Sequence, residues 1–69
     1  MKIQYDKLAD AIYIYFKNGK ISKTIKLKDQ LLVDVDNRGK IVGLEILDAS
    51  SQVPKNEIGH IKIGIPVVA

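Results

Sequence analysis

The sequence predicts an α+β protein built on an antiparallel β-meander of four to six short strands, with one short helical segment near the C-terminus. Three observations predict this class. Apolar and polar residues alternate with a period of two in several short runs, turn-forming residues separate these runs, and helix-capping residues follow the last of them. Because the chain has 69 residues, we expect one small domain over residues 1–69, near the lower size limit for a self-sufficient core.

The first strand is expected over residues 2–5 and the second over about residues 9–17, with a turn at residues 6–8 between them. In the second run, isoleucine and phenylalanine alternate with alanine and tyrosine. Successive side chains of a strand point to opposite faces, so this alternation predicts one strongly apolar face.

The dipeptide Asn18-Gly19 predicts a tight hairpin between the second strand and the third, because both residues tolerate the positive φ of a type I′ turn. The third strand would then run back directly beside the second. The expected cross-strand pairs are Tyr13 with Thr24 and Tyr15 with Ser22.

Two further turns, at residues 28–30 and 37–40, predict the rest of the meander. A one-residue shift of register would move every apolar side chain to the other face. We therefore expect the loop lengths that keep the apolar face continuous. The expected pairs are Leu27 with Leu31, Ile25 with Val33, Val35 with Val42, Val33 with Leu44, and Leu31 with Ile46. The expected core face is Ile12, Ile14, Phe16, Ile21, Ile25, Leu27, Leu31, Val33, Val35, Val42, Leu44 and Ile46.

The C-terminal third predicts a short helix and a last edge strand. Asp48 or Ser50 is the expected N-cap, Pro54 limits the early part of the helix, and Gly59 ends it. Residues 61–67 alternate again and contain a proline, which suits an edge strand. One face of a single sheet has to be covered, so we expect either this tail or a partner subunit to cover it.

Composition narrows the class of protein. The chain has no cysteine, which excludes disulfides and thiolate metal sites. No apolar run reaches the roughly 18 residues of a membrane-spanning helix, and no signal peptide pattern opens the chain. We therefore expect a soluble cytoplasmic protein without membrane contact.

The net charge of +3 is unevenly distributed, because no acidic residue lies between Asp10 and Asp29 while five lysines do. A lysine-rich hairpin of this kind can bind nucleic acid, and Tyr13 and Tyr15 could stack on bases. The alternative is a solvated strand whose lysines discourage edge pairing. Since arginine and any known nucleic-acid motif are missing from this stretch, we do not expect nucleic acid as the main partner.

The acidic residues Asp34, Asp36 and Glu45 form the candidate metal site, with calcium as the candidate cofactor. Numbered from Asp34, the segment has aspartate, aspartate, glycine and glutamate where a calcium loop has ligands and its sharp turn. Arg38 stands where an oxygen ligand belongs, and the flanking residues predict strands rather than helices. Within the hairpin the three carboxylates share one sheet face, with Glu45 diagonal to Asp34. The sequence therefore predicts at most weak binding, and solvated carboxylates are the alternative.

No catalytic residues are predicted. His60 is the single histidine and fits an exposed position better than a general base, and the pair Asp6 and Asp10 lacks the pocket that acid–base chemistry needs. No phosphate-binding loop, nucleophile elbow or histidine metal triad is present. We therefore expect a protein that is not an enzyme.

Several motifs taken together resemble a known family. They are Tyr5-Asp6, Ala9-Asp10-Ala11-Ile12-Tyr13-Ile14, Val33-Asp34-Val35-Asp36 and Gly39-Lys40-Ile41-Val42-Gly43-Leu44-Glu45-Ile46-Leu47-Asp48-Ala49-Ser50. Over about residues 2–52 the chain resembles the small prokaryotic domain-of-unknown-function family numbered 2283. The resemblance implies a compact β-meander with a short C-terminal helical segment, and it implies no activity. From context rather than biochemistry, members of that family are considered partners of small toxin-like proteins.

These observations predict an interaction module that engages a protein partner or forms a homodimer. The first alternative is a weak calcium-binding protein that uses Asp34, Asp36 and Glu45, and the second is a nucleic-acid-binding protein that uses the lysine-rich hairpin.

Overall fold

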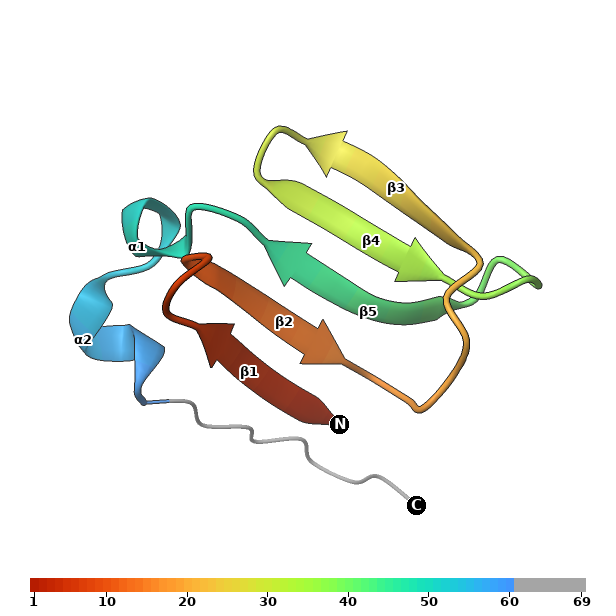
Figure 1. Cartoon of the computed structure of the whole chain (residues 1–69), viewed down its shortest axis with the longest axis horizontal. Coiled ribbons are helices and arrows are strands. Elements are labelled where there is room, and N and C mark those ends of the chain that lie inside the picture. The colour runs from red at the N-terminus through yellow and green to blue at the C-terminus, as the bar shows by residue number, and fades with distance from the viewer. Residues whose placement is uncertain (61–69) are drawn as a thin grey trace, which may run out of the picture.

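A computed structural model describes residues 1–60, which form one antiparallel five-stranded sheet and two short helices (Figure 1). The predicted class, α+β with a β-meander, is confirmed. The strand order is β1-β2-β5-β4-β3. The elements are β1 (Lys2–Asp6), β2 (Ala11–Tyr15), β3 (Lys23–Lys28), β4 (Leu31–Val35), β5 (Ile41–Ile46), α1 (Ala49–Gln52) and α2 (Lys55–Ile58).

The connection between β2 and β3 is the main difference from the sequence prediction. The predicted hairpin at Asn18-Gly19 is wrong, because β2 pairs with β1 and β5, while β3 pairs with β4 and with no other strand of residues 1–60. Neither of these two residues has the positive φ that a type I′ turn requires. Residues 16–22 instead cross the end of the sheet, where the backbone N–H of Phe16 donates to Val42 O at 2.8 Å.

The composition of β3 explains this arrangement. All six of its residues are exposed and three of them are lysines, whereas β4 and β5 carry buried valines. A charged strand is stable at the edge of a sheet and costly at its centre. The local turn signal at Asn18-Gly19 is therefore overridden by the tertiary preference for β5 and β4 in the middle.

The two other hairpins are present, and most of the predicted register is confirmed. Ile25 lies opposite Val33, and Val33 lies opposite Leu44. Two predicted pairs are shifted by one residue, since Lys28 rather than Leu27 faces Leu31, and Ile41 rather than Val42 faces Val35. Each shift occurs at a β-bulge, which inserts one extra residue that alternation alone does not reveal.

Residues that face each other across antiparallel strands share a face of the sheet. The apolar face contains a row that crosses all five strands, namely Ile3, Ile14, Leu44, Val33 and Ile25. We call the other side the tyrosine face; its two rows are Gln4, Tyr13, Glu45, Leu32 and Lys26, and then Lys2, Tyr15, Gly43, Asp34 and Thr24. The sequence prediction paired the tyrosines with β3, whereas the structure pairs them with β5.

The predicted helical segment is divided into two helices at one end of the sheet (Figure 1). Asp48 occupies the predicted N-cap position with a φ of 51°, but its side chain accepts a hydrogen bond from the Ser51 hydroxyl instead of capping α1. Pro54 precedes α2 and Gly59 follows it. The predicted edge strand at residues 61–67 lies outside the described residues. No helix among residues 1–60 is long and apolar enough to cross a membrane.

Candidate functional site

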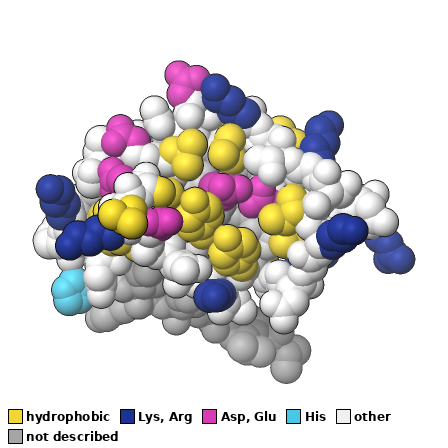
Figure 2. All heavy atoms as spheres, in the orientation of Figure 1, with side chains coloured by type: hydrophobic (Ala, Val, Ile, Leu, Met, Phe, Trp, Pro, Cys, Tyr) yellow, Lys and Arg dark blue, Asp and Glu magenta, His cyan; other side chains and the backbone are white. Residues whose placement is uncertain are grey.

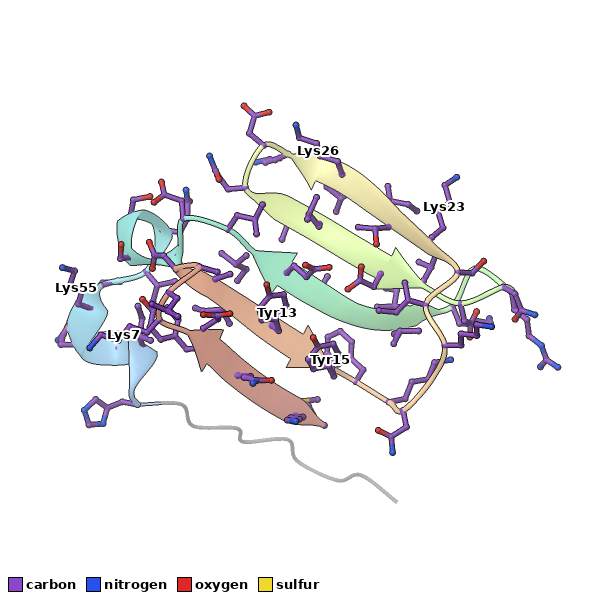
Figure 3. All side chains as sticks on the ribbon, in the orientation of Figure 1. Lys7, Tyr13, Tyr15, Lys23, Lys26 and Lys55 are labelled. Atoms are coloured by element: carbon purple, nitrogen blue, oxygen red, sulfur yellow. The ribbon has the colours of Figure 1, made fainter. Side chains whose placement is uncertain are left out.

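The tyrosine face brings two aromatic rings and two carboxyl groups together. Tyr13 and Tyr15 stand two positions apart on β2, so they lie on the same face, and their rings are nearly parallel at 7° with centroids 6.2 Å apart. Figure 3 shows the two rings side by side along β2. In Figure 2, acidic side chains lie at the centre of this face among hydrophobic ones, while lysine and arginine lie toward its margins.

Asp34 and Glu45 are the acidic pair of this face, and β4 and β5 place them diagonally, as the register predicted. Asp34 is only 2% exposed, and it accepts a hydrogen bond from the Thr24 hydroxyl at 2.6 Å. Burial, hydrogen bonding to Asp34 and the Asp34 charge together raise the pKa of Glu45 to about 7. Near neutral pH, Glu45 can therefore carry a proton and donate it in a hydrogen bond to Asp34.

Gly43 lies opposite Tyr15, and the missing side chain lets the strands pack closely. A Cβ atom built at Gly43 would lie 2.6 Å from the Ile14 carbonyl oxygen and 3.3 Å from Cδ1 of Tyr15. Real Cβ atoms essentially never approach backbone atoms that closely. Glycine is therefore required here for steric reasons, and the Tyr15 ring covers the backbone that it leaves bare.

Asp36, the third predicted metal ligand, is not part of this group. It lies in the turn after β4, where its carboxylate accepts the backbone N–H groups of Arg38 and Lys40, both at 2.9 Å. Its other oxygen contacts Nζ of Lys17 at 2.7 Å. The hydrogen bond and charge of Lys17 and the two backbone donors lower the pKa of Asp36 to about 2. The structure thus brings Asp34 and Glu45 together and uses Asp36 for the turn.

Within residues 1–60, no group of three or more histidine or carboxylate side chains is placed to hold a metal ion. Of the three predicted ligands, Asp34 and Glu45 are the two that the structure brings together. The single histidine, His60, is exposed beyond α2, in agreement with its predicted position.

Asp10 forms a second polar cluster that joins the β1–β2 turn to α1. Its carboxylate accepts hydrogen bonds from the hydroxyls of Tyr5 at 2.8 Å and Ser50 at 2.7 Å, and from the Ser50 backbone N–H at 3.1 Å. The hydrogen bonds from Ser50 and Tyr5 lower the pKa of Asp10. Its backbone has a φ of 50°. Asp10 therefore ties the β1–β2 turn to α1, while Asp6 accepts hydrogen bonds within its own turn.

The role of Ser50 was missed from the sequence, although Asp10 and Ser50 both lie in the motifs quoted above. The turn amides are bound by Asp6 instead, which accepts the backbone N–H groups of Leu8 at 3.0 Å and Ala9 at 3.1 Å. The partner of Asp10 is 40 residues away in sequence. A pairing at that distance leaves no periodic signal.

The outer edge of β3 is the other distinctive surface. Its lysines are Lys23, Lys26 and Lys28, and its apolar side chains Ile25 and Leu27 are 38% and 59% exposed. Lys26 makes a loose ion pair with Asp29 at 3.6 Å between two exposed side chains. Figure 3 shows Lys23 and Lys26 extending from this strand at the margin of the sheet. The predicted lysine-rich hairpin is thus replaced by a lysine-bearing edge strand.

Together, these features define a small α+β domain with an open antiparallel sheet, an acidic pair beneath two tyrosines and one lysine-bearing edge. The chain belongs to the family described as "Protein of unknown function (DUF2283)", whose model matches residues 2–50. It is 44% identical over 50 residues to an uncharacterised protein of Methanocaldococcus jannaschii, a match that covers 72% of this chain. The matched segment spans only 42% of that longer protein. No solved structure matches the chain.

Proposed function

We propose that this chain is a non-enzymatic binding module that engages a protein partner through the outer edge of β3. The observation that carries the proposal is the combination of exposed apolar side chains with an unpaired strand edge. In the described residues β3 pairs only with β4, and Ile25 and Leu27 are the large apolar side chains exposed on it. An exposed apolar strand edge is a preferred place for another chain to add.

A neighbouring residue extends this surface. Phe16 and Ile21, in the connection that leads into β3, are 41% and 43% exposed. The backbone N–H of Ser22 donates to Val35 O at 2.8 Å and so holds the end of this connection against β4. Phe16 lies next to β5 at the end of the sheet, whereas Ile21 lies just before β3, so Ile21 is the residue of this connection that extends the apolar side chains of β3.

A retention experiment with matched variants tests the proposal. The double variant Ile25→Thr and Leu27→Ser removes apolar surface from β3, while threonine keeps a β-branched side chain in the strand. Its control is Leu8→Ser and Ile41→Thr, at positions that are 100% and 52% exposed elsewhere. We expect immobilised wild type and the control to retain the same protein from a lysate of the source organism. The β3 variant should not retain it, while circular dichroism shows that all three proteins are folded.

Equal retention by both variants, or no retained protein, would contradict the proposal. The same edge could instead bind a second copy of the chain. Light scattering over a range of protein concentrations detects such self-association. A homodimer that the β3 variant dissociates would show that the partner is a second copy of the chain.

Weak calcium binding at Asp34 and Glu45 is a second candidate function, supported by the proximity of these two carboxyl groups on the tyrosine face. Two carboxylates with water in the remaining positions are far fewer ligands than calcium normally takes. We therefore propose affinity no better than the millimolar range of weak sites, on the order of 10⁻³ M.

A further inference from the structure

We propose that the partner segment is an extended acidic peptide that adds to the sheet as a sixth strand along β3. This inference rests on the proposed function and specifies its partner. Three features of the strand support it: its free backbone edge, its lysines and the alternation of its side chains.

The free backbone edge supplies the hydrogen bonds. β3 is the last strand in the order and pairs with β4 alone, so alternate N–H and C=O groups on its other side have no strand partner within the described residues. An added strand satisfies such groups with main-chain hydrogen bonds, which provide affinity without requiring a particular sequence. The six residues of β3 offer an edge of about 20 Å at 3.3 Å per residue.

The opposite edge of the sheet is less suited to this role. β1 carries one apolar residue that is partly buried, Ile3, and ends in the acidic Asp6. The end of β1 also lies close to α2, because Tyr5 and Ile58 line the same shallow cavity. Strand addition is therefore expected at β3 rather than at β1.

The charge of β3 selects an acidic peptide. Lys23, Lys26 and Lys28 lie within six residues, and Lys26 makes only a loose 3.6 Å contact with Asp29. If two copies of β3 paired edge to edge, three lysines from each strand would place six ammonium groups at the interface. Like charges on adjoining strands are destabilising. Acidic side chains on the incoming strand turn the same repulsion into attraction.

The side-chain alternation defines the preferred pattern of the peptide. Thr24 and Lys26 lie on the tyrosine face, opposite Asp34 and Leu32, while Ile25 lies on the apolar face, opposite Val33. A strand with acidic and β-branched residues in alternation presents one kind of side chain to each face. The acids can lie near Lys26 on the tyrosine face, or near Lys23 and Lys28, which lie opposite Val35 and Leu31 on the face of Ile25.

The test uses a synthetic peptide of alternating glutamate and valine, with its ends blocked and a length that matches β3. Amide spectra and hydrogen exchange of the whole chain locate the binding. We expect the peptide to shift and protect amides of residues 23–28 and to leave residues 2–6 unchanged. Because exposed ion pairs are screened by salt, binding should weaken about tenfold between about 50 and about 500 mM NaCl.

Charge-reversal variants provide the matched comparison. Lys23→Glu with Lys26→Glu reverses two charges on β3, while Lys7→Glu with Lys55→Glu makes the same change in net charge next to the helices (Figure 3). All four lysines are exposed, so both proteins should fold. We expect the first variant to lose binding of the acidic peptide and to bind a peptide of alternating lysine and valine instead. The second should bind the acidic peptide within about twofold of wild type.

Several results would overturn the inference. They are equal binding of the acidic and basic peptides, equal loss of binding in both variants, and undiminished binding of a peptide whose backbone amides are methylated. Tighter binding of a single-stranded oligonucleotide at the same amides would assign the edge to nucleic acid. If the acidic peptide fails while the Ile25→Thr and Leu27→Ser variant still loses its protein partner, the proposed function stands and the strand-addition inference is wrong.

Discussion

Replacing Glu45 by glutamine should make the protein more stable at alkaline pH while leaving it nearly unchanged at mildly acidic pH. Glutamine is nearly isosteric with protonated glutamate and can still donate a hydrogen bond to Asp34, but it cannot ionise. The wild-type side chain has a folded-state pKa of about 7 against an ordinary value of 4.5, because it is partly buried and faces Asp34. The folded protein therefore holds a proton that the unfolded chain has already released.

The sign and size of the effect follow from this difference. Between about pH 4.5 and about pH 7 the folded state binds more protons than the unfolded state, so the free energy of unfolding falls as the pH rises. The difference of about 2.5 pH units, from 4.5 to about 7, sets an upper limit of roughly 3 kcal/mol at 1.36 kcal/mol per unit, and solvent screening of this partly exposed group lowers the effect below that limit. The stabilisation is complete below pH 4.5 and is lost as the pH passes through about 7.

Urea denaturation followed by circular dichroism, at about pH 5 and about pH 8.5, measures the effect. The Glu45→Gln variant should exceed wild type by up to roughly 3 kcal/mol at the higher pH and by much less at the lower one. The matched control is Glu57→Gln, at an exposed carboxylate in α2.

The other groups with shifted pKa values titrate outside this range. The pKa values of Asp10 and Asp36 are lowered, and those of Tyr5 and Tyr15 are raised above 10. A stability difference between Glu45→Gln and wild type that is the same at both pH values would refute the assignment. So would a Glu57→Gln variant with the same alkaline gain.

Three further predictions concern the glycine, the turn and the calcium candidate. Gly43→Ala should lower the free energy of unfolding by about 1–3 kcal/mol, because its Cβ would overlap the neighbouring strand; Gly59→Ala, with open space around it, should not. Asp36→Asn should be less stable than wild type near neutral pH, and this gap should close as the pH falls from 3.8 to about 2, since the lowered pKa stabilises the fold only while Asp36 is ionised. Calcium titration should move the amides of Asp34 and Glu45 more at about pH 8 than at about pH 6, because protons compete at Glu45; no response at either pH would reject calcium binding.

Local sequence rules predicted the parts of the fold that local turns control. The hairpin around Gly39, which has a φ of 78°, and the pairing of Ile25 with Val33 follow from loop length and alternation. The β-bulges were not predictable, because the residues that they leave without a cross-strand partner, Leu27 and Val42, are of the same apolar type as the residues that alternation pairs. The error at each bulge was a single residue.

The candidate site was predictable only where it depends on a local hairpin. The diagonal placement of Asp34 and Glu45 follows from the hairpin that joins β4 to β5. Tyr13 of β2 lies opposite Glu45 and Tyr15 lies opposite Gly43, and the sequence assigned those tyrosines to the wrong neighbour. A raised pKa at Glu45 could not be inferred without knowing which strand lies beside β5.

The position of β2 links the acidic pair to the free edge. A hairpin at Asn18-Gly19 would place β3 beside β2 inside the sheet, where both of its backbone edges would be used and β5 would become the edge strand. The observed order places β2 beside β5 instead, so Tyr13 lies opposite Glu45, and among the described strands β3 is left with one open side. The open edge is thus a consequence of the topology, whereas Lys23 and Lys26 affect only what binds there. For this reason the charge-reversal variant should change the preferred peptide without changing the fold or the pH dependence that arises from Glu45.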